Sequence, residues 1–289
     1  MVIFKMAKDL QDFLHSPARG GANLGFVPTM GALHEGHLSL VNQSLRENNL
    51  TVSSIFVNPA QFNDPADFQK YPVTVEEDIR LLEEAGCDVL FLPGLEEIYP
   101  GGRIPDTQYD LGSLESRLEG AYRPGHFQGV CKVVHRLLDL VDPTRLYLGL
   151  KDYQQCMVIA RLVRLLGREP GLEIVRCPTR REPSGLALSS RNKRLTEDQL
   201  IQAAGIYRSL QAIQQELGPG PLGPLKEQAA ATLAREGFRV DYVEIATADT
   251  LEPVTDWDGA RALVALVAAF LGEVRLIDNL LLARPGKHG

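Results

Sequence analysis

The sequence is poor in cysteine and in long apolar runs. Its four cysteines, Cys87, Cys131, Cys156 and Cys177, stand singly and far apart. They form no C-x-x-C pair or metal-finger spacing, so the sequence indicates neither a zinc site nor a disulfide framework. The most apolar stretch, 260–271, has about 12 residues, whereas a helix that spans a bilayer needs roughly 20. We therefore expect no membrane-spanning helix.

A surplus of positive charge is also missing. Thirty Lys and Arg residues face 37 Asp and Glu residues, which gives a formal net charge of −7. Proteins that bind nucleic acid usually show a basic face or a basic balance, so we expect no nucleic-acid partner. A small anion can still bind in a locally positive cleft. The segment 1–11 lacks the basic-then-apolar pattern of a signal peptide, so we expect a cytoplasmic protein.

Length and patterning predict two domains of α/β type. A chain of 289 residues is long enough for two domains. Up to about residue 175, β-branched runs such as 50–57 alternate with helical spacing such as 38–48. This alternation favours a Rossmann-like, doubly wound parallel sheet over residues 1–178. Residues 179–289 predict a smaller α+β domain, with helices over 200–217 and 225–236 and strands at 240–246, 262–270 and 274–281.

The strongest chemical signal is the segment Pro28–His37, PTMGALHEGH. It follows a predicted strand and opens a predicted helix, where unpaired N–H groups bind anions. Gly31 and Gly36 let the backbone approach a phosphate closely. His34 and His37 are three residues apart, so both lie on one face of a helical turn and can donate to phosphate oxygens. The segment predicts a site that stabilises charge on an α-phosphate, the alternative being two solvated surface histidines.

Two further loops follow predicted strands. Asn58 and Gln61 offer amides that both donate and accept, which suits the hydroxyl and carboxylate groups of a small substrate. Lys151 can neutralise phosphate, and Asp152 can cap a helix or hold a ribose hydroxyl. Gln155 can reach into the same cleft. Taken alone, the first loop is a strand-ending turn and the second an ordinary helix start, so both alternatives stay open.

A fourth loop, Leu188–Asn192, has the sequence LSSRN. Ser189, Ser190 and Arg191 supply two hydroxyls and a guanidinium, a combination that clamps a triphosphate tail. The alternative is a solvated turn before the helix cap at Thr196.

Together these segments resemble the pantothenate synthetase (pantoate–β-alanine ligase) family of the HIGH-motif nucleotidyltransferase superfamily. The resemblance runs nearly end to end, through FVPTMGALHEGHLSLV (26–41), IFVNPAQF (55–62), YRPGHFQGV (122–130), GLKDYQQ (149–155) and LALSSRN (186–192). It implies that ATP adenylates pantoate with release of pyrophosphate. The amine of β-alanine then attacks the pantoyl adenylate, giving pantothenate and AMP.

The resemblance also implies a set of site residues. His37, His34, Lys151 and Arg191 are expected to be catalytic. The expected ATP-binding residues are Met30, Gly31, Ala32, Leu33, His34, Glu35, Gly36, His37, Gly149, Leu150, Lys151, Asp152, Arg180, Leu188, Ser189, Ser190 and Arg191.

For the other ligands, Gln61 and Gln155 are expected to hold pantoate, and Gln61 also β-alanine. Asn58 and His126 are expected beside them in the substrate cleft. Mg²⁺ is expected with ATP as a hard cation on its phosphates, with Asp78 in contact with the metal. The resemblance further suggests a homodimer through the N-terminal domain.

Some positions depart from the family pattern, namely Leu148, Leu150, Val73, Arg180 and Lys132. None of these positions belongs to the histidines His34 and His37, to Lys151 or to the Ser-Ser-Arg group. We therefore expect the departures to adjust activity rather than abolish it. Two rival functions are another HIGH-motif transferase and a non-catalytic nucleotide sensor. An aminoacyl-tRNA synthetase core would need a basic appendage, which this acidic chain lacks.

Overall fold

The computed structural model describes residues 1–16 and 23–283, and these form two compact units, each with its own sheet and hydrophobic core. The first unit holds Met1–Leu150 and Gln154–Pro178. The second holds Lys151–Tyr153 and the chain from Thr179 on. The short segment Lys151–Tyr153, which the sequence analysis assigned to the first domain, is thus grouped with the second.

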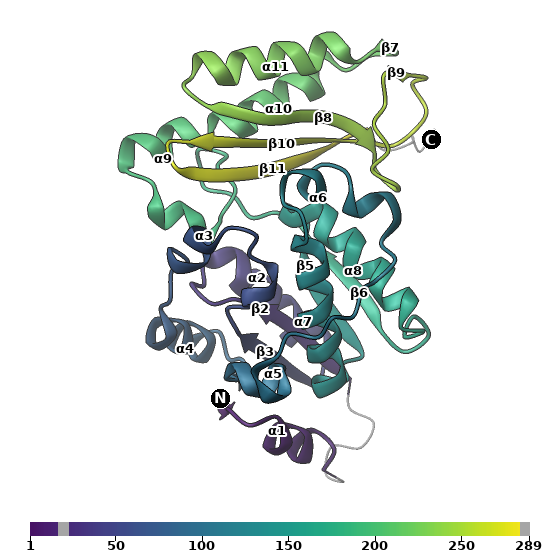
Figure 1. The fold of residues 1–289 in the computed structure, drawn as a ribbon. Coiled ribbons are helices and arrows are strands. Elements are labelled where there is room, and N and C mark those ends of the chain that lie inside the picture. Colours follow the sequence, from purple (N-terminus) through teal and green to yellow (C-terminus); the bar gives the residue numbers. More distant parts are fainter. Residues whose placement is uncertain (17–22, 284–289) are drawn as a thin grey trace. The chain divides into compact units, whose positions relative to one another are not determined.

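The first unit is built on a six-stranded parallel sheet with the order β1-β4-β3-β2-β5-β6 (Figure 1). Its strands are β1 (Val2–Phe4), β2 (Leu24–Thr29), β3 (Leu50–Ile55), β4 (Val89–Phe91), β5 (Arg145–Gly149) and β6 (Glu173–Cys177). From β2 the chain builds outward through β3 and β4, then crosses back to place β5 on the other side of β2. The strand order therefore reverses between β2 and β5, the position at which open parallel sheets bind their ligands.

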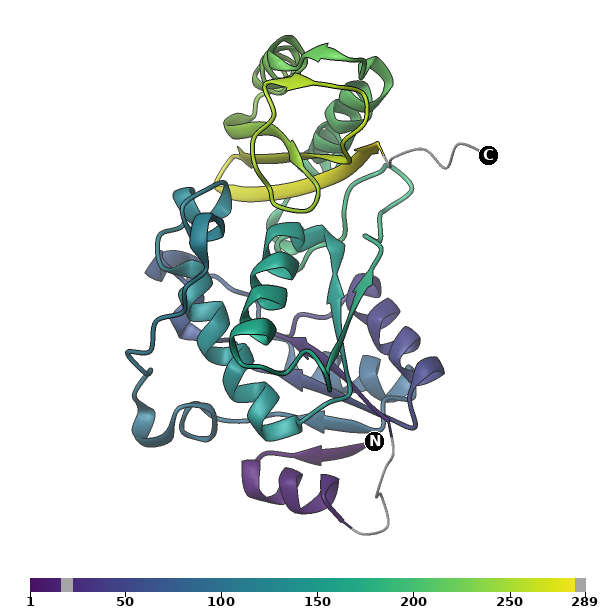
Figure 2. The ribbon, with the colours of Figure 1, turned by 90° about the vertical axis from the view of Figure 1, so that its right-hand side faces the viewer.

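Helices cover both faces of this sheet. They are α1 (Ala7–Leu14), α2 (Glu35–Glu47), α3 (Pro65–Gln69), α4 (Val75–Glu84), α5 (Leu95–Ile98), α6 (Glu119–Tyr122), α7 (His126–Val141) and α8 (Tyr153–Leu165). Successive strand residues point to opposite faces, so Phe26 packs with α1, α7 and α8, and Val27 packs with α2 and α4. Figure 2 shows α2 and α7 on opposite sides of the sheet. This arrangement confirms the predicted doubly wound α/β class.

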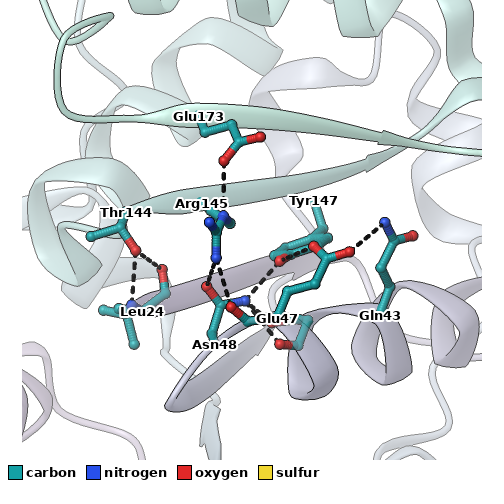
Figure 3. Close-up of polar contacts among 9 residues, drawn as sticks. Leu24, Gln43, Glu47, Asn48, Thr144, Arg145, Tyr147 and Glu173 are labelled. Atoms are coloured by element: carbon teal, nitrogen blue, oxygen red, sulfur yellow. Dashed lines mark hydrogen bonds and ion pairs between the residues drawn. The ribbon is translucent and has the colours of Figure 1, made fainter. Parts of the chain in front are cut away.

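A polar cluster holds the C-terminal end of α2 against β5 (Figure 3). Asn48 donates to the Tyr147 hydroxyl at 2.7 Å, and that hydroxyl donates to Glu47 Oε2 at 2.8 Å. Arg145 donates to the Glu47 carbonyl at 2.6 Å and to the Glu173 carboxylate at 2.8 Å. Helix α2 is therefore fixed at the end opposite to the predicted phosphate site.

The second unit packs helices against an antiparallel sheet of three strands in the order β11-β10-β8. Its elements are α9 (Glu197–Ala203), α10 (Gly205–Glu216), β7 (Gly220–Pro221), α11 (Gly223–Arg235), β8 (Arg239–Thr247), β9 (Asp256–Trp257), β10 (Leu263–Leu271) and β11 (Val274–Ala283). The single helix predicted for 200–217 is divided at Ala204 into α9 and α10. The Glu236 carboxylate lies beside Gly205 at this break.

Within the described ranges no helix is long and apolar enough to cross a membrane.

Candidate active site

The loop between β2 and α2, Met30–His34, makes a tight turn at the carboxyl end of β2. Gly31 has φ +80° and Ala32 has φ +49°, so two successive residues adopt the left-handed region. The glycine adopts it without strain, whereas an alanine there is uncommon. The Thr29 hydroxyl donates to the Ser54 carbonyl at 2.7 Å and accepts from Gly31 N–H at 3.2 Å, which ties the start of the turn to β3.

His34 is the N-cap of α2, and its side chain rather than a serine or aspartate satisfies the helix end. Its Nδ1 accepts from Gly36 N–H at 3.1 Å. A ring nitrogen that accepts a hydrogen bond carries no proton, so in the neutral ring the proton is on Nε2. The ring of His37 stacks on that of His34, with centroids 4.0 Å apart and planes inclined by 29°. The two histidine rings therefore lie together at the positive end of the helix dipole.

Asp78, in the first turn of α4, holds this loop by accepting hydrogen bonds from its backbone. Its Oδ2 accepts from Ala32 N–H at 2.8 Å, and its Oδ1 accepts from Leu33 N–H at 2.7 Å and from the Thr74 hydroxyl at 3.1 Å. The side chain is buried, with 1% of the residue exposed. A magnesium ion binds its few protein carboxylates while keeping several waters, and a carboxylate so enclosed does not offer that environment. Among the described residues there is also no group of three or more metal-ligating side chains.

Asn58 and Gln61 lie together in the 3₁₀ turn after β3, Pro59–Gln61. Asn58 Nδ2 donates to Gln61 Oε1 at 3.0 Å and to the Gly129 carbonyl at 3.1 Å. Its Oδ1 accepts from Ala60 N–H and from the Tyr99 hydroxyl, the latter at 2.8 Å. These four bonds fill the capacity of an amide, so the geometry favours Asn58 as a residue that orients Gln61. Tyr99 is a partner that the sequence analysis did not identify.

The amide nitrogen of Gln61 donates to Met30 Sδ at 3.0 Å, which brings the β2 loop and the β3 loop into contact. The backbone carbonyl of Gln61 accepts from His126 Nδ1 at 2.7 Å. The other ring nitrogen, His126 Nε2, lies 3.2 Å from an Arg123 guanidinium nitrogen. A carbonyl only accepts and a guanidinium only donates, so His126 carries its proton on Nδ1. Gln61 and His126, predicted from separate motifs, thus belong to one cluster with Met30.

The two glutamines at the start of α8 have different environments. Gln154 is buried, accepts from Glu119 N–H at 3.0 Å and donates to the carbonyls of Leu114 and Arg117. It holds the 114–119 loop in place. Gln155 is half-buried on the next position of the helix. Gln155 therefore remains the candidate for ligand contact, and Gln154 is a structural residue that sequence motifs alone do not distinguish from it.

The predicted residues of the second unit lie in two segments, 151–152 and 180–191. The backbone carbonyl of Lys151 accepts from Asn279 of β11 at 2.8 Å, and the Lys151 ammonium lies 3.6 Å from the Asp152 carboxylate. Ser189 caps the 3₁₀ turn Ser190–Arg194, and its hydroxyl accepts from Arg191 N–H at 3.3 Å.

Ahead of that turn, Arg180 is exposed, and its backbone carbonyl accepts from Leu188 N–H at 3.0 Å. Asn192 donates to the Ala187 carbonyl at 3.0 Å, which ties the Ser-Ser-Arg loop to the segment before it. Asn279, far from every motif in sequence, is a further partner that sequence reasoning missed.

Comparison with known proteins identifies the family of this chain. The sequence model of the family described as pantoate-beta-alanine ligase matches residues 2–281. A pantothenate synthetase of Cytophaga hutchinsonii is 44% identical over 285 residues, covering 98% of this chain and 99% of the relative. One from Bacteroides thetaiotaomicron is 44% identical over 282 residues, covering 97% of this chain and 98% of the relative.

Solved structures show the same likeness. The crystal structure of pantothenate synthetase from Thermus thermophilus superposes with a TM-score of 0.88 at 43% identity, covering 98% of this chain and all of that one. The pantoate-beta-alanine ligase of Francisella tularensis, solved as a complex with beta-gamma ATP and beta-alanine, gives a TM-score of 0.83 at 37% identity, covering 99% of this chain and all of that one. This chain belongs to the pantoate–β-alanine ligase family and is a ligase of pantothenate biosynthesis.

Proposed function

We propose that this enzyme condenses pantoate with β-alanine, using ATP, through a pantoyl-adenylate intermediate. The family match over residues 2–281 carries the proposal. The Francisella tularensis relative, named as a complex with beta-gamma ATP and beta-alanine, supports the same ligands here. We assign the ATP phosphates to the histidine rings at the N-terminus of α2, at the positive end of the helix dipole and at the switch point between β2 and β5.

In the first step, a carboxylate oxygen of pantoate attacks the α-phosphorus of ATP and pyrophosphate leaves. Negative charge grows on the phosphate oxygens as the new P–O bond forms. The Nε2–H of His34, which the Gly36 hydrogen bond directs away from the helix, donates to that charge together with His37. Met30, Leu33 and Glu35 complete the loop that lines the nucleotide.

In the second step, the amine of β-alanine attacks the carbonyl carbon of the pantoyl adenylate. The C–O bond to the phosphate breaks, AMP leaves, and the nitrogen loses a proton as the amide forms. The requirement on the protein is to hold the amine beside the acyl carbon. Gln61 is suited to that task because Met30, Asn58 and His126 fix its amide and its backbone.

Pantoate is a small hydroxy acid, and its hydroxyl and carboxylate groups match the amides of Gln61 and Gln155. We assign Asn58 to the same subsite through its hold on Gln61. His126 is assigned beside them through its hydrogen bond to the backbone carbonyl of Gln61.

The triphosphate is assigned to the cationic residues of the second unit. Lys151, Ser189, Ser190 and Arg191 supply an ammonium, two hydroxyls and a guanidinium for phosphate oxygens. Asp152 is assigned to the ribose, and the adenosine is assigned to the backbone of Gly149, Leu150, Arg180 and Leu188. Mg²⁺ is proposed as a hard cation that would offset the negative charge of the ATP phosphates, without a direct bond to Asp78.

Pantoate-dependent exchange between pyrophosphate and ATP tests the first half-reaction. Label from pyrophosphate is expected in ATP only when pantoate is present, and AMP and pantothenate are expected once β-alanine is added. Exchange that depends on another acid but not on pantoate would contradict the proposal and favour a different HIGH-motif transferase. Nucleotide binding without any turnover would favour a nucleotide sensor.

Two further properties are proposed on the family likeness. The enzyme is expected to be a homodimer, which light scattering of the purified protein at micromolar concentration tests. It is also expected to act in the cytoplasm, which cell fractionation tests.

A further inference from the structure

We infer that Asp78 is a positioning residue of the histidine loop, and that it holds the backbone which presents His34 and His37 rather than a metal ion. The inference rests on the proposed function only in taking this loop as the ATP site. The carrying observation is that a buried carboxylate from α4 accepts both N–H groups of Ala32 and Leu33.

The loop needs such a support because of its own conformation. Gly31 and Ala32 both have positive φ, at +80° and +49°. Successive N–H groups in this conformation converge to form a small anion-binding concavity. Without an acceptor in this concavity, the two buried N–H donors would be unsatisfied. Ala32 would then return to a conformation with negative φ. The carboxylate of Asp78 fills the concavity with one oxygen for each N–H group.

Steric contacts enforce the same arrangement. A Cβ on Gly31 would stand 2.9 Å from Asp78 Oδ2 and 3.0 Å from Ile55 Cγ2, so the turn is packed directly on the carboxylate. Ala32 and Leu33 are buried, at 0% and 3% exposed. The turn is therefore enclosed and lies in direct contact with Asp78.

The two histidines follow directly after this fixed segment. His34 N-caps α2, and the opposite end of that helix is held by Asn48 and Tyr147 (Figure 3). Because the helix is fixed at both ends, the positions and orientations of the two histidine rings are fixed as well. Loss of the Asp78 contacts releases the end that carries the chemistry, and catalysis is sensitive to displacements of about 1 Å.

The contacts also argue against direct Mg²⁺ ligation. Oδ1 already accepts two hydrogen bonds, from Leu33 N–H and the Thr74 hydroxyl, and Oδ2 accepts from Ala32 N–H. With 1% of the residue exposed, a hydrated ion has no approach to either oxygen. Mg²⁺ requires a near-octahedral shell at about 2.0–2.1 Å and retains waters, which this site does not accommodate.

The matched variants for the test are Asp78→Asn and Glu77→Gln. Both remove one carboxylate charge from the first turn of α4, but Glu77 is half-exposed and pairs with Arg80. Asn keeps the size of Asp and turns an NH₂ group toward one of the two backbone N–H donors. In Asp78→Asn we expect turnover in the exchange assay to fall about 100-fold. The KM for ATP and the Mg²⁺ concentration for half-maximal activity are expected to change far less. Glu77→Gln is expected to match the parent enzyme.

Two results would overturn the inference. One is an Asp78→Asn enzyme as active as Glu77→Gln, and the other is recovery of its activity at high Mg²⁺, which would show a metal ligand. If Asp78→Asn does not fold, Thr74→Val removes only the third hydrogen bond and is expected to lower turnover in the same sense. An unchanged turnover in a folded Thr74→Val enzyme would count against the inference.

A second readout needs no catalysis. The Cε1–H signals of His34 and His37 in an NMR spectrum of the ligand-free protein should shift and broaden in Asp78→Asn and stay in place in Glu77→Gln. Unmoved signals contradict the inference. Failure of the parent protein to catalyse pantoate-dependent exchange would contradict the proposed function alone, because the histidine signals still report on the loop.

Discussion

His34 and His37 stack face to face, with ring centroids 4.0 Å apart and planes inclined by 29°. One turn of helix separates them, and the backbone N–H of His37 donates to the His34 carbonyl at 2.8 Å. Nδ1 of His34 is engaged as the helix cap, so the protonated nitrogen of the neutral ring is Nε2. The arrangement suits a ligand with several anionic oxygens better than a single-charge ligand.

Replacing His37 with alanine tests its place in catalysis. The variant is expected to lose a factor of about 10²–10³ in turnover, the loss typical of one donor removed from a developing negative charge. Its ring is half-buried, so the melting temperature should change little. Exchange kinetics and a thermal melt give both numbers. A variant that unfolds would instead indicate a structural role.

His34 allows its two roles to be separated. In His34→Asn, the amide oxygen can still cap α2, but no group replaces the Nε2–H donor. Stability is expected to stay near that of the parent while turnover falls about 10²-fold. In His34→Ala, the cap is lost as well, at a cost of about 1 kcal/mol. Equal stability of the two variants by urea denaturation would show that the cap contributes nothing.

Gly129→Ala tests the packing of the Gln61 turn on α7. A Cβ at this position would stand 2.0 Å from the Ala60 carbonyl oxygen and 2.6 Å from Gln61 Cα, so the turn must move. We expect a loss of about 2–3 kcal/mol and a rise in the KM for pantoate. Gly171→Ala is the control, since no atom lies within 4 Å of its Cβ. Similar behaviour of both variants would refute the argument.

Asn279→Ala tests the anchor of Lys151. It removes an amide donor from the Lys151 carbonyl, a bond of 2.8 Å, and is expected to cost about 1 kcal/mol and to reduce turnover. Gln214→Ala is the matched control, because it removes an exposed amide donor from the Leu281 carbonyl of the same strand at 3.0 Å. A turnover that falls equally in both would show that the effect is not specific to Lys151.

The buried thiols predict a loss of stability at alkaline pH. Burial raises the pKa of Cys131 from 9.0 to about 12. Between these values the unfolded chain releases the proton and the folded chain keeps it, so the free energy of unfolding falls as pH rises. One such group contributes a slope approaching about 1.4 kcal/mol per pH unit. Urea denaturation across this range should show a shallower decline for Cys131→Ala, and an unchanged slope would contradict the assignment.

Local sequence patterns were sufficient for the architecture of the first unit. The β-branched run at 50–57 became β3, and the helical spacing at 38–48 became most of α2, because each element buries a face that recurs within its own residues. The edge strand β1 was not predicted. It has three residues and obtains its hydrogen bonds from β4, about ninety positions away, so its own composition carries little signal.

The motifs named the candidate residues, and the structure added their hydrogen-bond partners. H-x-x-H at a helix start already indicated an anion site, since spacing alone places both rings on one face. The sequence alone does not distinguish the roles of the Asn58 and Gln61 side-chain amides. Their difference depends on Tyr99, which lies 41 positions from Asn58 and fills its last acceptor site.

The sequence by itself determined the parallel α/β class and the family, and it led to the proposal that His34 and His37 bind phosphate, because these depend on contiguous residues and on motif order. Only the tertiary structure decided that Asp78 supports the histidine loop and that Asn279 holds Lys151. In both cases the partner is a backbone N–H or carbonyl, which every residue has. No residue type marks such a partner in the sequence, so the path of the folded chain selects it.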